Sequence, residues 1–568
     1  MSSSRQEPTY LKKELFKATL SSKGIYITNQ HSQSCQDADG DADDNDNGSD
    51  SFLLFHDDEA SLRSCFACGY NNSSVSSSSA STSTKQPKYV PFKNIIYAEA
   101  RPASSSSTKR SNQVTVTYVI PDHADITTKA TKLSINKINV EIEDLQQASV
   151  ANYIMQKAYS SKTMQQCSIL VLINPHGGQG KAVQIYNNHI KPILQAAHCK
   201  ITLQETEYSG HATDIARELD IDQYDVIACC SGDGIPHEVI NGFYQRSRDL
   251  GVAAFNKLII TQLPCGSGNA FSLSTLGGSK YPEIATWLML KSKPTKIDLM
   301  AITQGTGERM NTKLSFLSQC YGIIADSDIG TEHLRWLGSI RFDIGVIQRV
   351  FSNAKYPCDL YVEFWSQNKT EIAQHVEQHL SSSDESSKTL TDDEEDDNEQ
   401  VSVATSDLGL HLVTTKDLTT GKANLDEPVP QTWQALPEEI CKNLNILYVG
   451  KMPYVSSDAQ FFPAALPNDG YMDMIITDAH HTSVLSLTSI LLNVEKGKHI
   501  DDDAVLHAKI KAYRLVPRMT DTKDHYISVD GESFPFESFQ VEILPNVMTG
   551  LLQDGKFTET VLTRYSST

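Results

Sequence analysis

The residues best suited to chemistry are Ser231, Gly232, Asp233 and Gly234, within the stretch VIACCSGDGIPHEVING (226–242). The apolar run before them predicts a buried strand, and Pro236 with the apolar spacing after it predicts a helix over 235–248. A carboxylate on such a turn lies at the carboxyl edge of a parallel sheet, where ligands bind. Asp233 is therefore a candidate general base, and the alternative is that it only caps the helix.

Three further turns rich in small residues follow predicted strands in the same region. Their backbone amides and the helix amino termini behind them are suited to holding phosphates, although the spacing is neither that of a Walker loop nor that of a dinucleotide fingerprint. Four such loops, one of them with a carboxylate, predict a nucleotide site with Asp233 as the base. The three further loops are NPHGGQGK (174–181), TEYSGHA (206–212) and LPCGSGNA (263–270).

The elements that position these loops alternate between strand and helix over residues 164–305. This alternation predicts an α/β domain with a parallel, doubly wound sheet and right-handed crossovers. We expect strands at 168–173, 200–207, 225–230 and 258–263, and helices at 181–198, 211–219 and 235–248.

From about residue 306 onward the pattern changes to strands joined by turns. It predicts a mostly antiparallel β-sandwich over 306–366 and 437–568, split by an acidic insert at 367–436 that we expect to be disordered. The expected strands are 314–325, 358–365, 444–449, 471–477, 507–516, 526–529 and 539–544, with helices at 331–350 and 483–495.

Residues 10–160 predict a small amino-terminal domain. Strands expected at 16–28, 89–99, 113–120 and 135–143, followed by a helix at 144–159, have the order of a pleckstrin-homology-like barrel. An acidic and then serine-rich insert at 31–86 is expected to be disordered.

Two cysteines in that insert, Cys65 and Cys68, have apolar neighbours. A zinc site would need a second ligand pair, which is not visible nearby. Reversible lipidation, such as palmitate, is the functional interpretation, and two ordinary free thiols is the alternative.

The chain of 568 residues is long enough for about three domains, and its formal charge of −21 is concentrated in two runs. Residues 36–59 carry −10 and residues 384–399 carry −8, which leaves −3 for the rest. This distribution gives no support to a nucleic-acid partner. The eleven cysteines form no disulfide framework, and the sequence shows no signal peptide and no apolar run of 18 residues. We expect a cytoplasmic protein that spans no membrane.

Several of these motifs resemble a known family. NPHGGQGKA, SGDGIPHEVING and LPCGSGNA are similar to the nucleotide-site motifs of the diacylglycerol-kinase catalytic-domain superfamily. The segment IADSDIGTEHLRWLGSIRF (324–342) resembles the sphingoid-base signature of its sphingosine-kinase branch, and Val529-Asp530-Gly531-Glu532 resembles the last family motif. The strand domain and the acidic inserts look most like those of fungal long-chain-base kinases.

The resemblance implies an ATP- and Mg²⁺-dependent lipid kinase with Asp233 as the proton acceptor. Its substrates would be sphingoid long-chain bases such as sphingosine, dihydrosphingosine and phytosphingosine, phosphorylated on the primary hydroxyl. The enzyme would work peripherally at the cytoplasmic face of the endoplasmic reticulum, Golgi, endosome or plasma membrane. The oligomeric state is left open.

The resemblance also implies site residues. The lipid would be bound by Asp328 at its polar head together with Ser231, Gly232, Asp233 and Gly234, and no metal ligand is assigned. ATP contacts would come from Asn174, Pro175, His176, Thr206, Glu207, Tyr208, Ser209, Gly210, Ser231, Gly232, Gly234, Glu238, Gly266, Ser267, Gly268, Arg335, Arg341, Asp530, Gly531 and Glu532.

These roles are chemically consistent. A carboxylate that accepts the proton of an alcohol, a poor nucleophile, helps its attack on a γ-phosphate. A carboxylate such as Asp328 can pair with the ammonium of a sphingoid base. A diacylglycerol or ceramide kinase and a catalytically silent lipid-binding regulator are the alternatives. An NAD-kinase-like or phosphofructokinase-like enzyme shares the glycine turn but does not explain residues 326–342.

Overall fold

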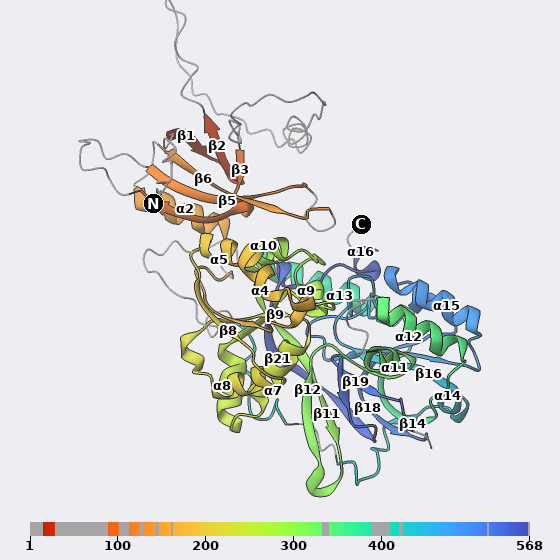
Figure 1. Ribbon diagram of the computed structural model, residues 1–568. Helices are drawn as coiled ribbons and strands as arrows, with labels where there is room; N and C mark the ends of the chain where they lie inside the picture. Colours follow the sequence, from red (N-terminus) through yellow and green to blue (C-terminus); the bar gives the residue numbers. More distant parts are fainter. Residues whose placement is uncertain are drawn as a thin grey trace, which may run out of the picture. The chain divides into compact units, whose positions relative to one another are not determined.

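The computed structural model describes residues 15–28, 89–101, 113–124, 129–142, 147–160, 163–331, 340–388, 409–419, 424–519 and 522–565. The chain divides into two compact units, one formed by residues 1–130 and 134–158 and the other by residues 131–133 and 159–568 (Figure 1). Cys65 and Cys68 lie outside the described residues.

The described residues of the amino-terminal unit form a six-stranded sheet, in the strand order β3-β2-β1-β6-β5-β4, and an α-helix that follows it. The expected strand 16–28 is two strands, because a turn at Ser21 and Gly24 reverses the chain. The order of strands followed by a helix is as expected, and the likeness to a pleckstrin-homology barrel stays a prediction. The elements are β1 (Leu15–Leu20), β2 (Gly24–Thr28), β3 (Tyr89–Pro91), β4 (Ile95–Ala100), β5 (Gln113–Pro121), β6 (Leu133–Glu141) and α2 (Gln147–Ala158).

The predicted parallel, doubly wound sheet of the α/β domain is confirmed. Its strands β7 (Ser168–Ile173), β8 (Lys200–Glu205), β9 (Val226–Ser231) and β10 (Ile259–Pro264) lie in the order β8-β7-β9-β10, all parallel. Strand β8 therefore lies beside one edge of β7, and β9 lies beside the opposite edge of β7. The switch point, where ligands bind in such sheets, therefore lies between the carboxyl ends of β7 and β9.

The helices of this domain differ in detail from the expected ones. The expected helix at 181–198 contains a π-helical turn, η2 (Tyr186–Ile190), and the helix at 235–248 ends early, because Ser247 is extended and a new helix starts after it. The helices are α3 (Gly177–Gly180), α4 (Ala182–Ile185), α5 (Lys191–Ala196), α6 (His211–Glu218), α7 (Gly234–Tyr244), α8 (Arg248–Lys257), α9 (Ala270–Thr275) and α10 (Pro282–Lys291).

The antiparallel β-sandwich of the carboxyl-terminal half is also confirmed. Its strands are β11 (Lys293–Gln304), β12 (Asn311–Ser315), β13 (Ser318–Gly322), β14 (Cys358–Ser366), β15 (Gln434–Ala435), β16 (Leu444–Gly450), β17 (Met472–Asp478), β18 (Leu506–Pro517), β19 (Ile527–Val529), β20 (Glu532–Phe534) and β21 (Phe539–Leu552). Strand β11, which the sequence did not predict, pairs with β21 from Lys293↔Leu552 to Gln304↔Phe539. Strand β21 also lies beside β10, at Ile260↔Gly550, so the two halves share one 15-stranded sheet (Figure 1).

The expectation of one strand over 314–325 was wrong in two respects. The segment belongs to two strands, β12 and β13, separated by Phe316 and Leu317, and it leaves the sheet before residue 325. Gly322 has a φ of 100°, which ends β13, and α11 (Ile323–Gly330) starts there. The expected helix at 331–350 corresponds to α12 (Ile340–Phe351). Asp326 and Asp328 therefore lie on a helix, and the apolar residues Ile323, Ala325 and Ile329 of that helix are buried.

The acidic insert is ordered in part, against expectation. Helix α13 (Lys369–Lys388) buries Ile372 and Val376 against Ala464 and Leu466. Their spacing of four residues gives the helix an apolar face, which the charge of the segment concealed. The remaining helices are α14 (Glu438–Asn443), α15 (Val484–Leu492) and α16 (Val561–Tyr565), and none of the described helices is long and apolar enough to cross a membrane.

Candidate functional site

The four predicted loops lie together at the carboxyl edge of the parallel sheet. Asn174, Pro175 and His176 follow β7, and the loop from Thr206 to Gly210 follows β8. Ser231 to Gly234 follow β9, and Gly266 to Gly268 follow β10. Because the strands are parallel neighbours, one ligand can reach several of these loops.

Two of the glycines allow the loops after β9 and β10 to touch. A Cβ atom on Gly266 would lie 2.4 Å from the Cα of Gly232, and one on Gly268 would lie 2.8 Å from Oδ2 of Asp233. Any larger residue would push the two loops apart. These glycines are therefore required by the packing of the site itself.

The carboxylate of Asp233 is fixed by three donors. Oδ2 accepts a hydrogen bond from the amide of Ala270 at 3.0 Å, and Oδ1 accepts from the amide of Phe271 at 3.1 Å and from Nε2 of Gln262 at 3.2 Å. Asp233 makes no side-chain bond to the start of its own helix, α7, so the capping alternative is wrong. Its carboxylate instead binds the first turn of α9.

The surroundings of Asp233 shift the pKa of its carboxyl in opposite directions. Burial raises the pKa of its carboxyl above the ordinary value, and the negative charge of Asp530 acts in the same direction. The hydrogen bonds from Ala270, Phe271 and Gln262 lower that pKa. The net effect is a raised pKa, which makes the carboxylate a better proton acceptor.

Glu238 fastens the loop after β8 to helix α7. Its Oε1 accepts from the amide of Gly210 at 3.1 Å and its Oε2 accepts from the amide of Ala212 at 3.0 Å. In the first loop, Asn174 Oδ1 similarly accepts from the amide of His176 at 3.0 Å. These two predicted ATP contacts thus shape their loops.

The last motif forms the turn between β19 and β20. Asp530 and Gly531 have φ values of 52° and 83°, as a two-residue hairpin turn with the sequence Asp-Gly requires. The buried carboxylate of Asp530 accepts hydrogen bonds from Ser315 Oγ, from the amides of Phe316, Leu317 and Ser318, and from His237 Nδ1. The structure gives Asp530 the role of holding this hairpin against α7.

The hairpin connects Asp233 with Asp328. A Cβ atom on Gly234 would lie 2.9 Å from Oε1 of Glu532, and one on Gly531 would lie 4.0 Å from Oδ2 of Asp328. Asp328 Oδ2 also accepts from Ser528 Oγ at 2.8 Å. The turn bearing Asp233 and the helix bearing Asp328 therefore flank the same hairpin.

The neighbouring Asp326 has a different environment. Its Oδ2 accepts from Tyr356 Oη at 2.7 Å, and its Oδ1 accepts from the amide of Tyr526 at 3.0 Å. His525 Nδ1 lies 2.8 Å from the same Oδ2. Asp326 is thus committed to packing α11. Of the two predicted arginines, Arg335 lies outside the described residues, and Arg341 belongs to the first turn of α12.

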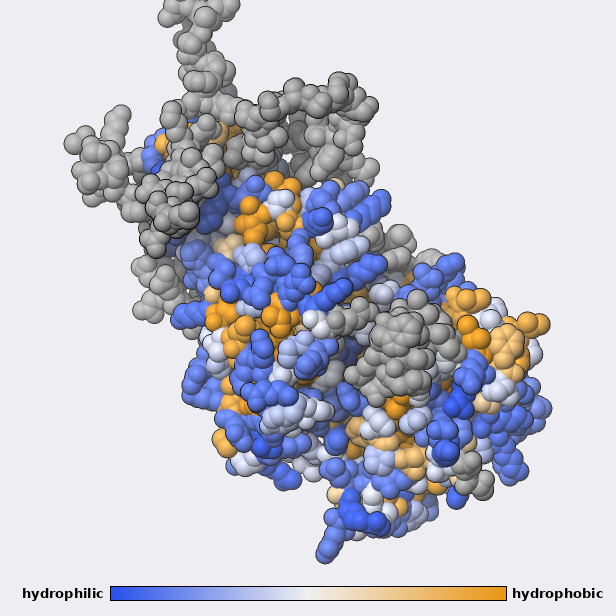
Figure 2. All heavy atoms as spheres, in the orientation of Figure 1, coloured by the Kyte–Doolittle hydropathy of each residue, from blue (hydrophilic) through white to orange (hydrophobic). Residues whose placement is uncertain are grey.

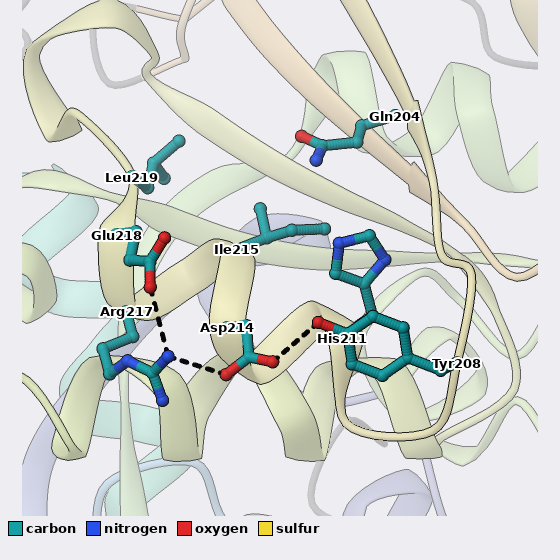
Figure 3. Close-up of a pocket in the computed structure, with 8 residues that line it drawn as sticks. All are labelled: Gln204, Tyr208, His211, Asp214, Ile215, Arg217, Glu218 and Leu219. Atoms are coloured by element: carbon teal, nitrogen blue, oxygen red, sulfur yellow. Dashed lines mark hydrogen bonds and ion pairs between the residues drawn. The ribbon is translucent and has the colours of Figure 1, made fainter.

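A pocket of about 440 Å³ opens beside the second loop (Figure 3). In it, Tyr208 stacks on His211 at a centroid distance of 4.5 Å and donates to Asp214. Arg217 bridges Asp214 and Glu218. Tyr208, Asp214, Arg217 and Glu218 are thus bonded to one another across the pocket, and Asp233 is not part of its wall.

The sequence analysis missed two residues that position the site, Gln262 and His237. Gln262 interrupts the apolar strand LIITQL, and a buried polar side chain in such a strand is a usable signal. His237 gave no signal, because its partner Asp530 lies 293 residues further along the chain.

The fold and the site define a kinase of the diacylglycerol-kinase type. Residues 168–302 match the Diacylglycerol kinase catalytic domain, and residues 441–552 match the YegS C-terminal NAD kinase beta sandwich-like domain.

Comparison with curated relatives shows to which kinases of this type the chain is similar. The chain is 40% identical over 82% of its length to "Sphingoid long chain base kinase 5" of Saccharomyces cerevisiae, of which it covers 71%. It is 32% identical over 81% of its length to "Sphingoid long chain base kinase 4" of Schizosaccharomyces pombe, of which it covers 87%. It is 29% identical over 67% of its length to "Sphingosine kinase 1" of Homo sapiens, of which it covers 89%. The chain belongs to the family of sphingoid long-chain-base kinases and is a lipid kinase that uses a nucleotide.

Proposed function

We propose that the protein transfers the γ-phosphate of ATP to the primary hydroxyl of sphingoid long-chain bases, with Asp233 as the general base. The observation that carries the proposal is the placement of Asp233 and Asp328 on either side of the hairpin at Asp530 and Gly531. Asp233 lies at the nucleotide loops, and Asp328 offers a negative charge beside the same hairpin. The names of the relatives support the choice of lipid.

In the proposed reaction, Asp233 accepts the proton of the substrate hydroxyl as the oxygen attacks the γ-phosphorus. The new O–P bond forms as the bond to the departing ADP breaks. The three donors on Asp233 hold its carboxylate in one orientation, so little reorganisation is needed during the step. Asp328 pairs with the ammonium of the sphingoid base and thereby places the hydroxyl.

We propose Mg²⁺ as the metal that accompanies ATP. Phosphate-bound Mg²⁺ needs only one or two protein carboxylates, and Glu532 at the Gly234 turn fits that need. When bound, Mg²⁺ neutralises charge on the phosphates.

We further propose that the enzyme works at the cytoplasmic face of a membrane, as a peripheral protein. Helices α12 and α15 lie side by side and expose large apolar side chains, with Ile347 55%, Phe351 73%, Leu485 82% and Leu492 74% exposed. Figure 2 shows apolar side chains gathered over α15. We name these four residues the apolar patch. Acylation of Cys65 and Cys68 is a second proposed attachment.

To test the function, the purified protein is incubated with labelled ATP and Mg²⁺ and with one of four lipids in parallel assays. The lipids are sphingosine, phytosphingosine, diacylglycerol and ceramide. We expect product with the two free amines only. Product with diacylglycerol or ceramide would contradict the substrate assignment, and no product would favour a silent regulator.

The Asp233→Asn variant should lose turnover while still binding ATP, and near-normal activity in it would refute the role of Asp233 as base.

A further inference from the structure

Gln262 is a fully buried polar residue within the apolar strand β10. Its Nε2 lies 3.2 Å from Asp233 Oδ1 and 3.5 Å from the carbonyl oxygen of Ser231, and its Oε1 accepts from the amide of Ser272 at 2.8 Å. A buried amide costs free energy unless both of its polar atoms are satisfied. Here both atoms are satisfied, by the loop after β9 on one side and by helix α9 on the other.

We propose that Gln262 is a positioning residue for Asp233, which holds the carboxylate in the orientation and ionised form needed for proton transfer. The proposal rests on Asp233 being the general base, as proposed above. Gln262 itself touches neither the reacting hydroxyl nor the phosphate in this scheme.

The network around Asp233 explains why Gln262 matters. The other two donors to the carboxylate are backbone amides in the first turn of α9, and the Ser272 amide of the same helix holds Gln262. Helix α9 and Gln262 therefore orient the Asp233 carboxylate together. Of the three donors, Gln262 alone is a side chain, so it is the one that a substitution can remove.

Removal of the Gln262 donor should change the pKa of Asp233 in one direction. The hydrogen bond from Gln262 favours the ionised carboxylate and so lowers the pKa of Asp233, whereas burial and Asp530 raise it. Two further titratable side chains lie near this turn, Glu532 at Gly234 and His237, which is bonded to Asp530. Without the Gln262 donor, the pKa of Asp233 rises further, and a higher pH is needed to ionise the base.

The test compares Gln262→Met, which keeps the length of the side chain but removes both its donor to Asp233 and its acceptor for the Ser272 amide, with Thr261→Val as a matched control. Thr261 is the preceding residue of β10, it is equally buried, and its hydroxyl has no hydrogen-bond partner among the described residues. Activity is measured as kcat and KM for ATP over a range of pH, and folding is measured as the urea midpoint.

We expect kcat of Gln262→Met at neutral pH to fall roughly tenfold or more, as for the loss of a hydrogen bond to a charged group. The acid limb of its pH profile should move to higher pH by up to about one unit, while the KM for ATP stays within about twofold. Gln262→Glu should move the limb further, because a second buried carboxyl disfavours a second negative charge. Thr261→Val should match the parent protein in kcat and pH profile.

An unchanged pH profile in both Gln262 variants would overturn the inference, as would an equal shift in Thr261→Val. If Gln262→Met does not fold, Gln262→Asn, which keeps a donor too short to reach Asp233, carries the same test. The Asp233→Asn variant separates the two proposals. If that variant is inactive and the Gln262 profiles are unchanged, only the positioning role fails; if it is active, the base assignment fails.

Discussion

His237 Nδ1 lies 2.8 Å from Asp530 Oδ2, and this contact fastens helix α7 to the hairpin between β19 and β20. The helix begins directly after Asp233, and the hairpin carries Glu532. This buried pair thus helps to join the nucleotide half of the site to the half that bears Asp328.

The two carboxylates of the hairpin should behave differently on substitution. Asp530→Asn replaces an acceptor by a donor among five donors, so we expect the free energy of unfolding to fall by about 2 kcal/mol or more. The exposed Glu532→Gln should change it by less than about 0.5 kcal/mol while lowering kcat. Urea unfolding and turnover of both variants check this. A stable but inactive Asp530→Asn would instead support the direct ATP contact that the family resemblance implies.

Asp328 should determine the use of the lipid. Asp328→Asn removes the negative charge that we expect to pair with the ammonium, so the KM for sphingosine should rise roughly tenfold, as for a lost charge-assisted contact. The KM for ATP should stay unchanged. Ser528→Ala, which removes the 2.8 Å bond to Asp328 Oδ2 but keeps the carboxylate, is the control and should have a smaller effect in the same direction. Equal losses toward both substrates would show that Asp328 is structural.

The apolar patch should be needed for membrane binding and dispensable for folding. The double variant Leu485→Ser and Leu492→Ser should bind vesicles of phosphatidylcholine and phosphatidylserine at least about tenfold more weakly, because each buried apolar side chain contributes about 1.5–3 kcal/mol. Phosphorylation of a detergent-solubilised base should be unaffected. Leu250→Ser on α8, 54% exposed, is the matched control. Equal vesicle binding by the two variants would exclude α15 from the membrane contact.

His499 should make stability depend on pH. It is buried, its Nε2 lies 3.0 Å from the carbonyl oxygen of Phe461, and burial lowers its pKa from 6.5 to about 4. The unfolded chain therefore takes up a proton first as the pH falls. The contribution of neutral His499 is fully present above about pH 6.5 and is lost progressively down to about pH 4, by about 3 kcal/mol in all.

The His499→Gln variant tests this dependence, because glutamine keeps a donor for Phe461 and does not titrate. The difference in unfolding free energy between the parent protein and the variant should change between pH 7 and pH 4. Urea titrations at several pH values measure it, and a constant difference would disprove the assignment.

The sequence predicted those parts of the site that depend on local patterns. The four glycine loops follow short apolar strands, and both the strand and the turn are encoded within about ten residues. The parallel order of the sheet followed from alternation alone. The partners of Asp233 could not be predicted in this way, because Gln262 and the amides of α9 come from 29 to 38 residues away.

The wrong predictions have physical causes as well. The strand expected over 314–325 extends through apolar residues that α11 buries equally well, and the left-handed Gly322 decides between the two. In the acidic insert, the charge of residues 384–399 concealed the apolar face of α13. Composition describes a whole segment, whereas packing selects individual positions within it.

The sheet shared by the two halves has a mechanical consequence. Strand β21 pairs with β11 along most of its length and lies beside β10, which ends in the loop of Gly266 to Gly268. Of these pairings, the one between β10 and β21 joins the two halves, at Ile260↔Gly550. A hinge at this point would have to break that pairing, so the shared sheet opposes closure of the halves on one another. Because these strands belong to one compact unit, we expect the described residues from 163 onward to unfold in one cooperative transition.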